Sequence, residues 1–257
     1  MRIPSNMKNA MVPERADKVL FIWLLLAGWF GVLIGVPWTI AVLRGYPGTK
    51  WWWEGAIDFL FFIPISASVG VWIGKKVGLG SGLRELVSGT PGSWKQVSLA
   101  IVPGTLVGLA MGTLGLISQN VIPKDVLIPE LNNPNTFELF LRCLSASLTE
   151  EIAFRFGLMS LFVWIIRSIV RGPAVQTPSL WIGNLLSALV FAAAHFPQLE
   201  LQRYGLSLLI TFVVSSSGTG MILGWLYMRY GLISAITAHL ITDLVANVIP
   251  RLVLLIP

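Results

Sequence analysis

Cysteine and charge are both scarce in this chain of 257 residues. The single cysteine, Cys143, excludes an intramolecular disulfide and a metal site built from several cysteines. Only 12% of the residues are charged whereas 55% are hydrophobic, a composition typical of membrane proteins. The net charge of +6 does not indicate nucleic-acid binding, because the basic residues lie in short segments between apolar runs.

Long apolar runs dominate what the chain does contain. Seven of them reach or approach the roughly 20 residues that a helix needs to cross a bilayer. The predicted spans are 19–43, 56–74, 97–117, 137–170, 181–196, 206–228 and 232–249. The predicted fold class is therefore all-α, a polytopic bundle of about seven transmembrane helices with eight as the alternative. The first run is too long for the core of a signal peptide, so we expect a retained membrane anchor.

The predicted spans divide the chain into four parts. We expect a polar N-terminal tail (1–18), three N-terminal spans with their loops (19–136), a core of four spans (137–249) and a short C-terminal tail (250–257). The run from Ser215 to Gly218 predicts an interruption in the sixth span. Small residues predict close helix packing in the third and sixth spans, at Gly104, Gly108, Gly112, Gly115, Gly220 and Gly224.

Lysine and arginine are unequally divided between the two sides of this bundle. With the N-terminus inside, eleven lie in inside segments: Arg2, Lys8, Arg15, Lys18, Lys75, Lys76, Arg84, Lys95, Arg167, Arg171 and Arg229. Five lie in outside segments: Arg44, Lys50, Lys124, Arg203 and Arg251. Because basic residues are enriched in cytoplasmic loops, this bias predicts a cytoplasmic N-terminus and an external C-terminus. We expect a multi-pass protein of a plasma membrane, and the compact architecture favours a prokaryotic one.

The fourth span carries the most unusual residues of the chain, Glu150, Glu151 and Arg155. Each charge costs about 2.5–3.5 kcal/mol at the centre of a membrane helix, so the default interpretation is a functional site. Glu151 and Arg155 are four residues apart and are predicted to form an ion pair. Glu150 is rotated by about 100° and has no cation within one helical turn. We expect it to point into the bundle as a candidate general base.

The two histidines of the chain, His195 and His239, also lie in predicted spans. Asp243 follows His239 by four residues and shares its helix face. At about 1.5 Å of rise per residue, Glu150 and His195 lie at similar depths near the middle of the bilayer. A carboxylate and several polar side chains that converge in an apolar cavity can activate water. Such a cavity suits hydrolysis of a peptide or an ester inside a membrane.

Three motifs in this region resemble those of the CPBP family, which comprises CAAX proteases and bacteriocin-processing enzymes and is also called the Abi family. They are Glu150-Glu151-x-x-x-Arg155, Phe191-x-x-x-His195 and His239-x-x-x-Asp243, in order and on separate spans. The resemblance covers about 137–249. It implies a helical intramembrane protease, related to the type II CAAX prenyl endopeptidase, with a cavity open to one side. It further implies that Glu150 and His195 hold and activate water, while His239 and residue 243 stabilise the oxyanion.

Asp243 departs from the prenyl-protease pattern, which commonly has asparagine at this position. An ionised aspartate would repel an oxyanion, and three alternatives follow. Asp243 is protonated through burial, or it orients His239 as a hydrogen-bond acceptor. In the third alternative, His195, His239 and Asp243 bind zinc and Glu150 acts as the base. The resemblance favours the metal-free mechanism.

These observations predict an intramembrane endopeptidase whose partners are the lipid bilayer and a peptide or lipidated protein. We expect the substrate to reach the cavity from the cytoplasm or the bilayer. Two other functional classes remain: a non-proteolytic immunity protein, chaperone or scaffold of the same fold, and a transporter in which a carboxylate relays protons.

Overall fold

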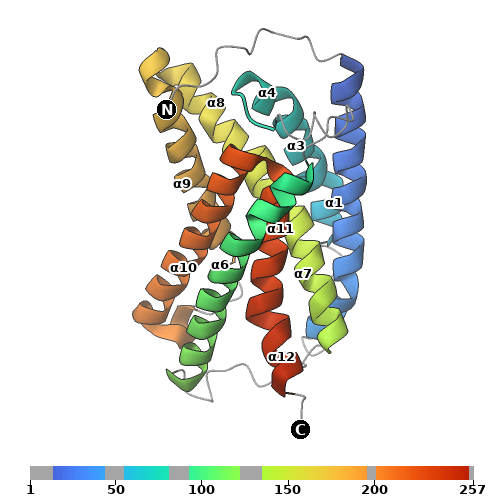
Figure 1. Ribbon diagram of the computed structural model, residues 1–257, viewed down its shortest axis with the longest axis vertical. Helices are drawn as coiled ribbons and strands as arrows, with labels where there is room; N and C mark the ends of the chain where they lie inside the picture. The colour runs from blue at the N-terminus through green and yellow to red at the C-terminus, as the bar shows by residue number, and fades with distance from the viewer. Residues whose placement is uncertain (1–13, 44–54, 81–92, 122–134, 196–200, 255–257) are drawn as a thin grey trace.

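The computed structural model describes residues 14–43, 55–80, 93–121, 135–195 and 201–254, and every element within these ranges is helical (Figure 1). Within these ranges, seven helical segments are long and apolar enough to cross a membrane, as predicted. They are Ala16–Ala41, Gly55–Lys76, Val97–Ile117, Thr136–Ile169, Pro173–Ala194, Leu209–Tyr230 and Leu232–Leu252. The chain is therefore a multi-pass, all-helical membrane protein.

Several spans are built from more than one type of helix. The first and third spans are α1 (Glu14–Leu43) and α6 (Ser93–Val121), and the second contains η1 (Asp58–Phe62), α3 (Ile63–Ser68), η2 (Val69–Ile73) and α4 (Gly74–Lys76). The fourth is α7 (Thr136–Glu150), the π-helical segment η3 (Glu151–Met159) and α8 (Ser160–Ile169). The fifth is η4 (Pro173–Val175) and α9 (Gln176–Ala194), and the sixth is α10 (Leu201–Tyr230). The seventh is α11 (Leu232–Asp243), η6 (Leu244–Val248) and α12 (Ile249–Leu254).

Two helices extend into the segments predicted as polar tails. Helix α1 already begins at Glu14, and residues 1–13 of the predicted N-terminal tail lie outside the described residues. Helix α12 continues to Leu254, through most of the predicted C-terminal tail. In both cases the helix extends beyond the apolar run that identified the span.

The predicted interruption of the sixth span is wrong, because α10 runs without a break from Leu201 to Tyr230. The three serines are accommodated within the continuous helix. Ser215 Oγ donates to the carbonyl oxygen of Phe212 at 3.1 Å, and Ser216 and Ser217 are buried. Serine in a membrane helix commonly bonds back to its own backbone in this way.

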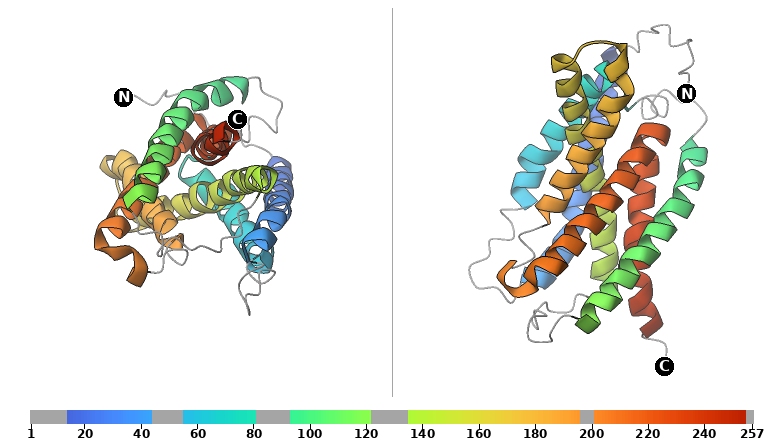
Figure 2. Two further views of the ribbon diagram at one scale, coloured as in Figure 1. Left: turned by 90° about the horizontal axis from the view of Figure 1, so that it is seen from below. Right: turned by 90° about the vertical axis from the view of Figure 1, so that its left-hand side faces the viewer.

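Small residues let the helices approach closely at most of the predicted positions. A methyl group on Gly104 would lie 2.7 Å from the carbonyl oxygen of Ala238, so α6 contacts the backbone of α11 directly. Gly220 on α10 similarly faces Ala188 on α9. Gly108, Gly112 and Gly224 make comparable contacts, whereas Gly115 has open space beside it. Figures 1 and 2 show α6 beside α11 and α9 beside α10. The glycine contacts leave little side chain between the helices of each pair.

The apolar core occupies one half of the bundle. It lies between the start of α1, the end of the second span, α8 and the turn from α10 to α11. Gly231 makes that turn with a φ of 92°, which glycine adopts without strain. The buried core residues include Leu20, Val71, Phe156, Met159, Val163, Tyr227 and Leu232. The other half of the bundle contains the cavity described next.

Candidate active site

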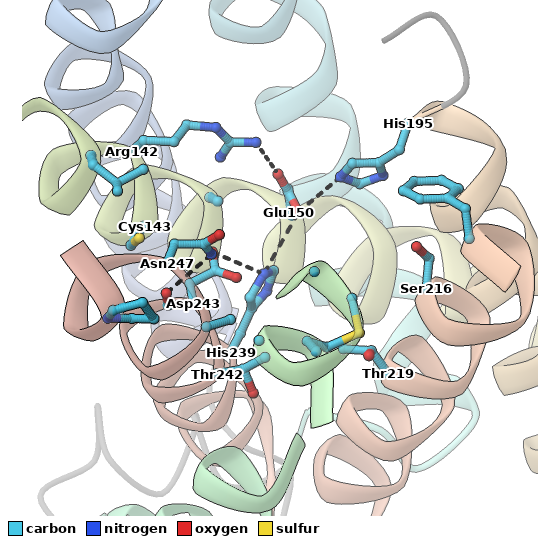
Figure 3. Close-up of a pocket in the computed structure, with 18 of the residues that line it drawn as sticks. Arg142, Cys143, Glu150, His195, Ser216, Thr219, His239, Thr242, Asp243 and Asn247 are labelled. Carbon is cyan, nitrogen blue, oxygen red and sulfur yellow. Dashed lines mark hydrogen bonds and ion pairs between the residues drawn. The ribbon is translucent and has the colours of Figure 1, made fainter. Parts of the chain in front are cut away.

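A cavity of about 620 Å³ lies in the half of the bundle opposite this core (Figure 3). Its walls come from α1, α6, α7, α9, α10 and the seventh span. The predicted residues Glu150, His195, His239 and Asp243 all line it. Further lining residues include Trp38, Leu116, Leu139, Arg142, Cys143, Phe212, Ser216, Thr219, Asn247, Pro250 and Arg251.

The Glu150 carboxylate lies between the two histidines. Its Oε2 atom is 3.9 Å from His195 Nε2 and 3.8 Å from His239 Nε2 (Figure 3). These distances exceed those of direct hydrogen bonds, which are roughly 2.7–3.2 Å. A single water molecule could therefore accept or donate hydrogen bonds to all three groups. The similar depth predicted for Glu150 and His195 agrees with this geometry.

Glu150 has a cationic partner two helical turns away, beyond the single turn within which the sequence offers none. Arg142 Nη2 lies 3.0 Å from Glu150 Oε1, and the two residues are eight positions apart on α7. Two helical turns separate them, and the long arginine side chain bridges that distance. Its guanidinium carbon also lies 5.2 Å from the centre of the Trp38 ring on α1, a cation–π contact. Arg142 holds one oxygen of Glu150 and leaves the other toward the histidines.

The predicted pair of Glu151 and Arg155 is present and buried. Arg155 Nη1 lies 3.2 Å from Glu151 Oε1, and the two side chains are 1% and 0% exposed. Arg155 also donates from Nη2 to the Gly220 carbonyl at 3.3 Å. Its guanidinium carbon lies 4.5 Å from the centre of the Phe191 ring. The arginine is therefore fixed by three different helices.

Glu151 has a second partner that the spacing of the sequence did not predict. Its Oε1 lies 2.8 Å from His239 Nδ1, across 88 positions of the chain. A carboxylate accepts, so His239 donates from Nδ1 and presents Nε2 to the cavity. The two consecutive glutamates thus have different surroundings. Glu150 lines the cavity, whereas Glu151 contacts His239 on the side of its ring that faces away from the cavity.

His195 is oriented by the end of its own helix. Helix α9 ends at Ala194, and His195 Nδ1 lies 2.7 Å from the carbonyl oxygen of Phe191. The carbonyl accepts, so Nδ1 carries the proton and Nε2 faces Glu150. The Phe191 ring packs against the His195 ring with 4.7 Å between centres and lies 6.2 Å from the His239 ring. The phenylalanine of the second motif therefore fixes both imidazoles.

Asp243 faces the cavity but does not orient His239. Its Oδ2 lies 3.7 Å from His239 Nε2, the cavity-facing nitrogen, whereas Glu151 occupies Nδ1. The alternative in which Asp243 is the orienting acceptor is thus wrong, because the first motif already supplies one. The Asp243 side chain is 24% exposed and lies at the cavity surface.

The zinc alternative has little support from this geometry. Two ligands on one tetrahedral zinc, each at about 2.0–2.1 Å, lie roughly 3.3 Å apart. Of the three ligands in that alternative, His239 and Asp243 have their nearest nitrogen and oxygen atoms 3.7 Å apart. Within the described ranges, no group of three or more histidine, cysteine, aspartate or glutamate side chains is arranged to hold a metal. These residues do not fit a zinc ion as they stand.

Sequence reasoning missed Arg142 and Trp38. A signal for Arg142 existed, since it is a further charged residue within the fourth span and such residues mark functional sites. Arg142 lies eight positions before Glu150, beyond the three or four residues that separate neighbours on one helix face. Trp38 gave no such signal, because tryptophan is common in this chain and its contact crosses to another helix.

Comparison with known proteins supports the resemblance. Residues 132–245 match the family model described as Type II CAAX prenyl endopeptidase Rce1-like. No curated protein and no solved structure matches the chain. The matched region contains all three motifs and therefore the whole Glu150, His195, His239 and Asp243 group. Residues 132–245 thus form a domain of the Rce1-like type II CAAX prenyl endopeptidase family, within a membrane protein of seven candidate spans.

Proposed function

We propose that this protein is an intramembrane endopeptidase that hydrolyses a peptide bond with water activated by Glu150. The observation that carries the proposal is the position of Glu150 Oε2, within 3.8–3.9 Å of two imidazole nitrogens in a cavity of about 620 Å³. A water hydrogen-bonded to Glu150 and His195 would lie about 2.8 Å from each. The family match supports peptide hydrolysis as the reaction class.

The reaction proceeds in two steps. Glu150 takes a proton from the water, and the water oxygen forms a bond with the carbonyl carbon of the substrate. The carbonyl oxygen gains the electron pair, and a protonated His239 ring donates to it from Nε2. Glu150 then returns its proton to the amide nitrogen, the carbon–nitrogen bond breaks, and a carboxylic acid and an amine leave.

Arg142, Glu151 and Arg155 act as positioning residues. Arg142 directs Glu150 through the 3.0 Å bond to Oε1, and Glu151 directs His239 through the 2.8 Å contact with Nδ1. Arg155 in turn neutralises Glu151, which is otherwise a carboxylate in a water-excluded bundle. Each reacting group is thus fixed by a second charged or polar group, as efficient catalysis requires.

A cleavage assay with a quenched peptide library in detergent tests the activity. We expect the purified protein to cleave a subset of the library, and Glu150→Ala to cleave none of it above background. A matched control is Glu138→Gln, at the start of the same helix, where glutamine also fits the capping box formed with Asn135. Equal cleavage by Glu150→Ala and the unaltered protein would overturn the assignment of the base and favour a non-proteolytic function.

Zinc content tests the metal-free mechanism. We expect active protein to contain no stoichiometric zinc and to keep its rate after treatment with a chelator, because the site geometry does not match zinc coordination. Elemental analysis and initial rates on the same samples give the answer. One zinc per chain, lost together with activity and regained with it, would contradict the proposal.

The orientation we propose has the N-terminus in the cytoplasm. Among the described residues, Lys75, Lys76, Arg167, Arg171 and Arg229 lie at the end of the bundle where α1 begins. The eleven-to-five division of basic residues in the sequence supports this end as the cytoplasmic one.

A further inference from the structure

The cavity extends from the middle of the bundle toward one end. At its inner limit lie Glu150 and His239. Toward the other limit lie residues near helix ends, which we call the cavity mouth: Trp38, Leu116, Leu139, Pro250 and Arg251. Trp38 precedes the end of α1, Leu139 follows the start of α7, and Pro250 lies in the last helix.

The opposite end of the bundle is filled by the apolar core. Leu20, Val71, Val163, Tyr227 and Leu232 are at most 2% exposed. Within the described ranges, the cavity lining includes no residue from the start of α1, the end of the second span or the turn between α10 and α11. A substrate therefore enters at the mouth, since the core blocks the other end.

The distribution of lysine and arginine indicates on which side of the membrane the mouth lies. The lysines and arginines that indicate the cytoplasmic side gather at the core end, beside the starts of α1, α6, α9 and α11 and the ends of α4, α8 and α10. With seven spans, the mouth and the C-terminal helix α12 lie on the other side. In the proposed orientation, the basic residues therefore lie on the cytoplasmic side, and the mouth through which a substrate enters lies on the opposite side.

We propose that the catalytic cavity is loaded from the non-cytoplasmic side, and that its substrates are peptide segments on the outer face of the membrane. This inference rests on the proposed function and orientation. It differs from the expectation that the substrate reaches the cavity from the cytoplasm or the bilayer. The substrate class is an extracytoplasmic segment of a membrane protein or an exported peptide, not the C-terminus of a cytoplasmic protein.

The depth of the site adds a requirement on the substrate. Glu150 lies eleven residues beyond Leu139 along α7, or roughly 16 Å at 1.5 Å per residue. An extended chain covers about 3.3 Å per residue, so about five residues separate the scissile bond from the mouth. The substrate must therefore present at least that length without folded structure beside the cleavage site.

Cysteine labelling determines which side the mouth faces, independently of any proteolytic activity. Cys143→Ser removes the only native thiol, and single cysteines then replace Leu139 at the mouth or the exposed Lys76 at the core end. We expect a membrane-impermeant maleimide to label Leu139→Cys in intact cells and Lys76→Cys only in inverted vesicles. Labelling both variants in detergent confirms that each thiol is reactive. The reverse pattern in membranes would overturn the inference.

A second arm measures cleavage in sealed vesicles. A membrane-impermeant quenched peptide library is added to right-side-out vesicles or to inverted vesicles from the same cells. We expect at least a tenfold higher rate in right-side-out vesicles, abolished by Glu150→Ala. Cleavage confined to inverted vesicles would overturn the inference. Cleavage in neither preparation, with outward labelling of Leu139→Cys, would contradict the proposed protease while the outward mouth stands.

Discussion

Replacing Glu150 by glutamine is expected to lower kcat by about 100-fold or more, the scale of losing a general base, with little change in melting temperature. The amide oxygen of glutamine can still accept from Arg142, whose side chain is 26% exposed and remains partly solvated. The fold therefore keeps the hydrogen bond, whereas the active site loses the group that takes the proton from water. Initial rates and thermal unfolding in detergent, measured together, test both parts.

The same substitution at Glu138 provides the control for this result. Glu138 Oε2 accepts from the Asn135 backbone at 2.8 Å, and glutamine preserves that cap. We expect Glu138→Gln to retain both rate and melting temperature. If Glu150→Gln unfolds early while Glu151→Gln stays stable but inactive, the roles of the two glutamates are assigned the wrong way round.

Replacing Glu151 by glutamine is expected to destabilise the protein by around 3–5 kcal/mol, the cost of breaking a buried ion pair. Arg155 would remain charged at 1% exposure, without the carboxylate of its ion pair and with the Gly220 carbonyl and the Phe191 ring beside it. The rate should fall as well, because His239 loses the carboxylate that accepts from Nδ1. Thermal unfolding and initial rates report the two effects separately.

A double variant separates the two roles of Glu151. Glu151→Gln with Arg155→Gln removes the unpaired cation and should recover part of the lost melting temperature. The rate should stay low, since no carboxylate faces His239 Nδ1. Recovery of the rate along with the stability would show that Glu151 has a structural role alone. An unchanged melting temperature for Glu151→Gln would show that the ion pair of Glu151 and Arg155 does not stabilise the fold.

Local spacing predicted the parts of the site that lie within one helix turn. The Glu151–Arg155 pair follows from a four-residue separation, and the seven spans follow from apolar length. The contact between Glu151 and His239 joins residues 88 positions apart, so no local rule reaches it. The pairing of Arg142 with Glu150 spans two turns and needs the length of an arginine side chain. Only the first of these contacts depends on how the helices pack; the second depends on the conformation of a long side chain within α7.

The error in the sixth span has a different origin. A run of serines and a glycine indicates a break when the hydroxyls compete with the backbone, but in α10 the Ser215 hydroxyl bonds back to its own helix. The direction of the cavity could not be predicted either. It depends on which half of the bundle the large apolar side chains fill, and the pattern of one helix does not reveal that.

Close contacts of α1 and α6 limit where this protein can be divided. Gly31 and Gly35 on α1 lie against Ser145 and Thr149 of α7, and Gly104 on α6 lies against the α11 backbone. Trp38 of α1 also supports Arg142. Helices α7 and α11 lie within the matched region 132–245, whereas α1 and α6 precede it in the sequence and pack against it. An excised fragment of those residues would lack the cavity walls that come from α1, α6 and the end of the seventh span, so the family match ends short of the structure that encloses the cavity.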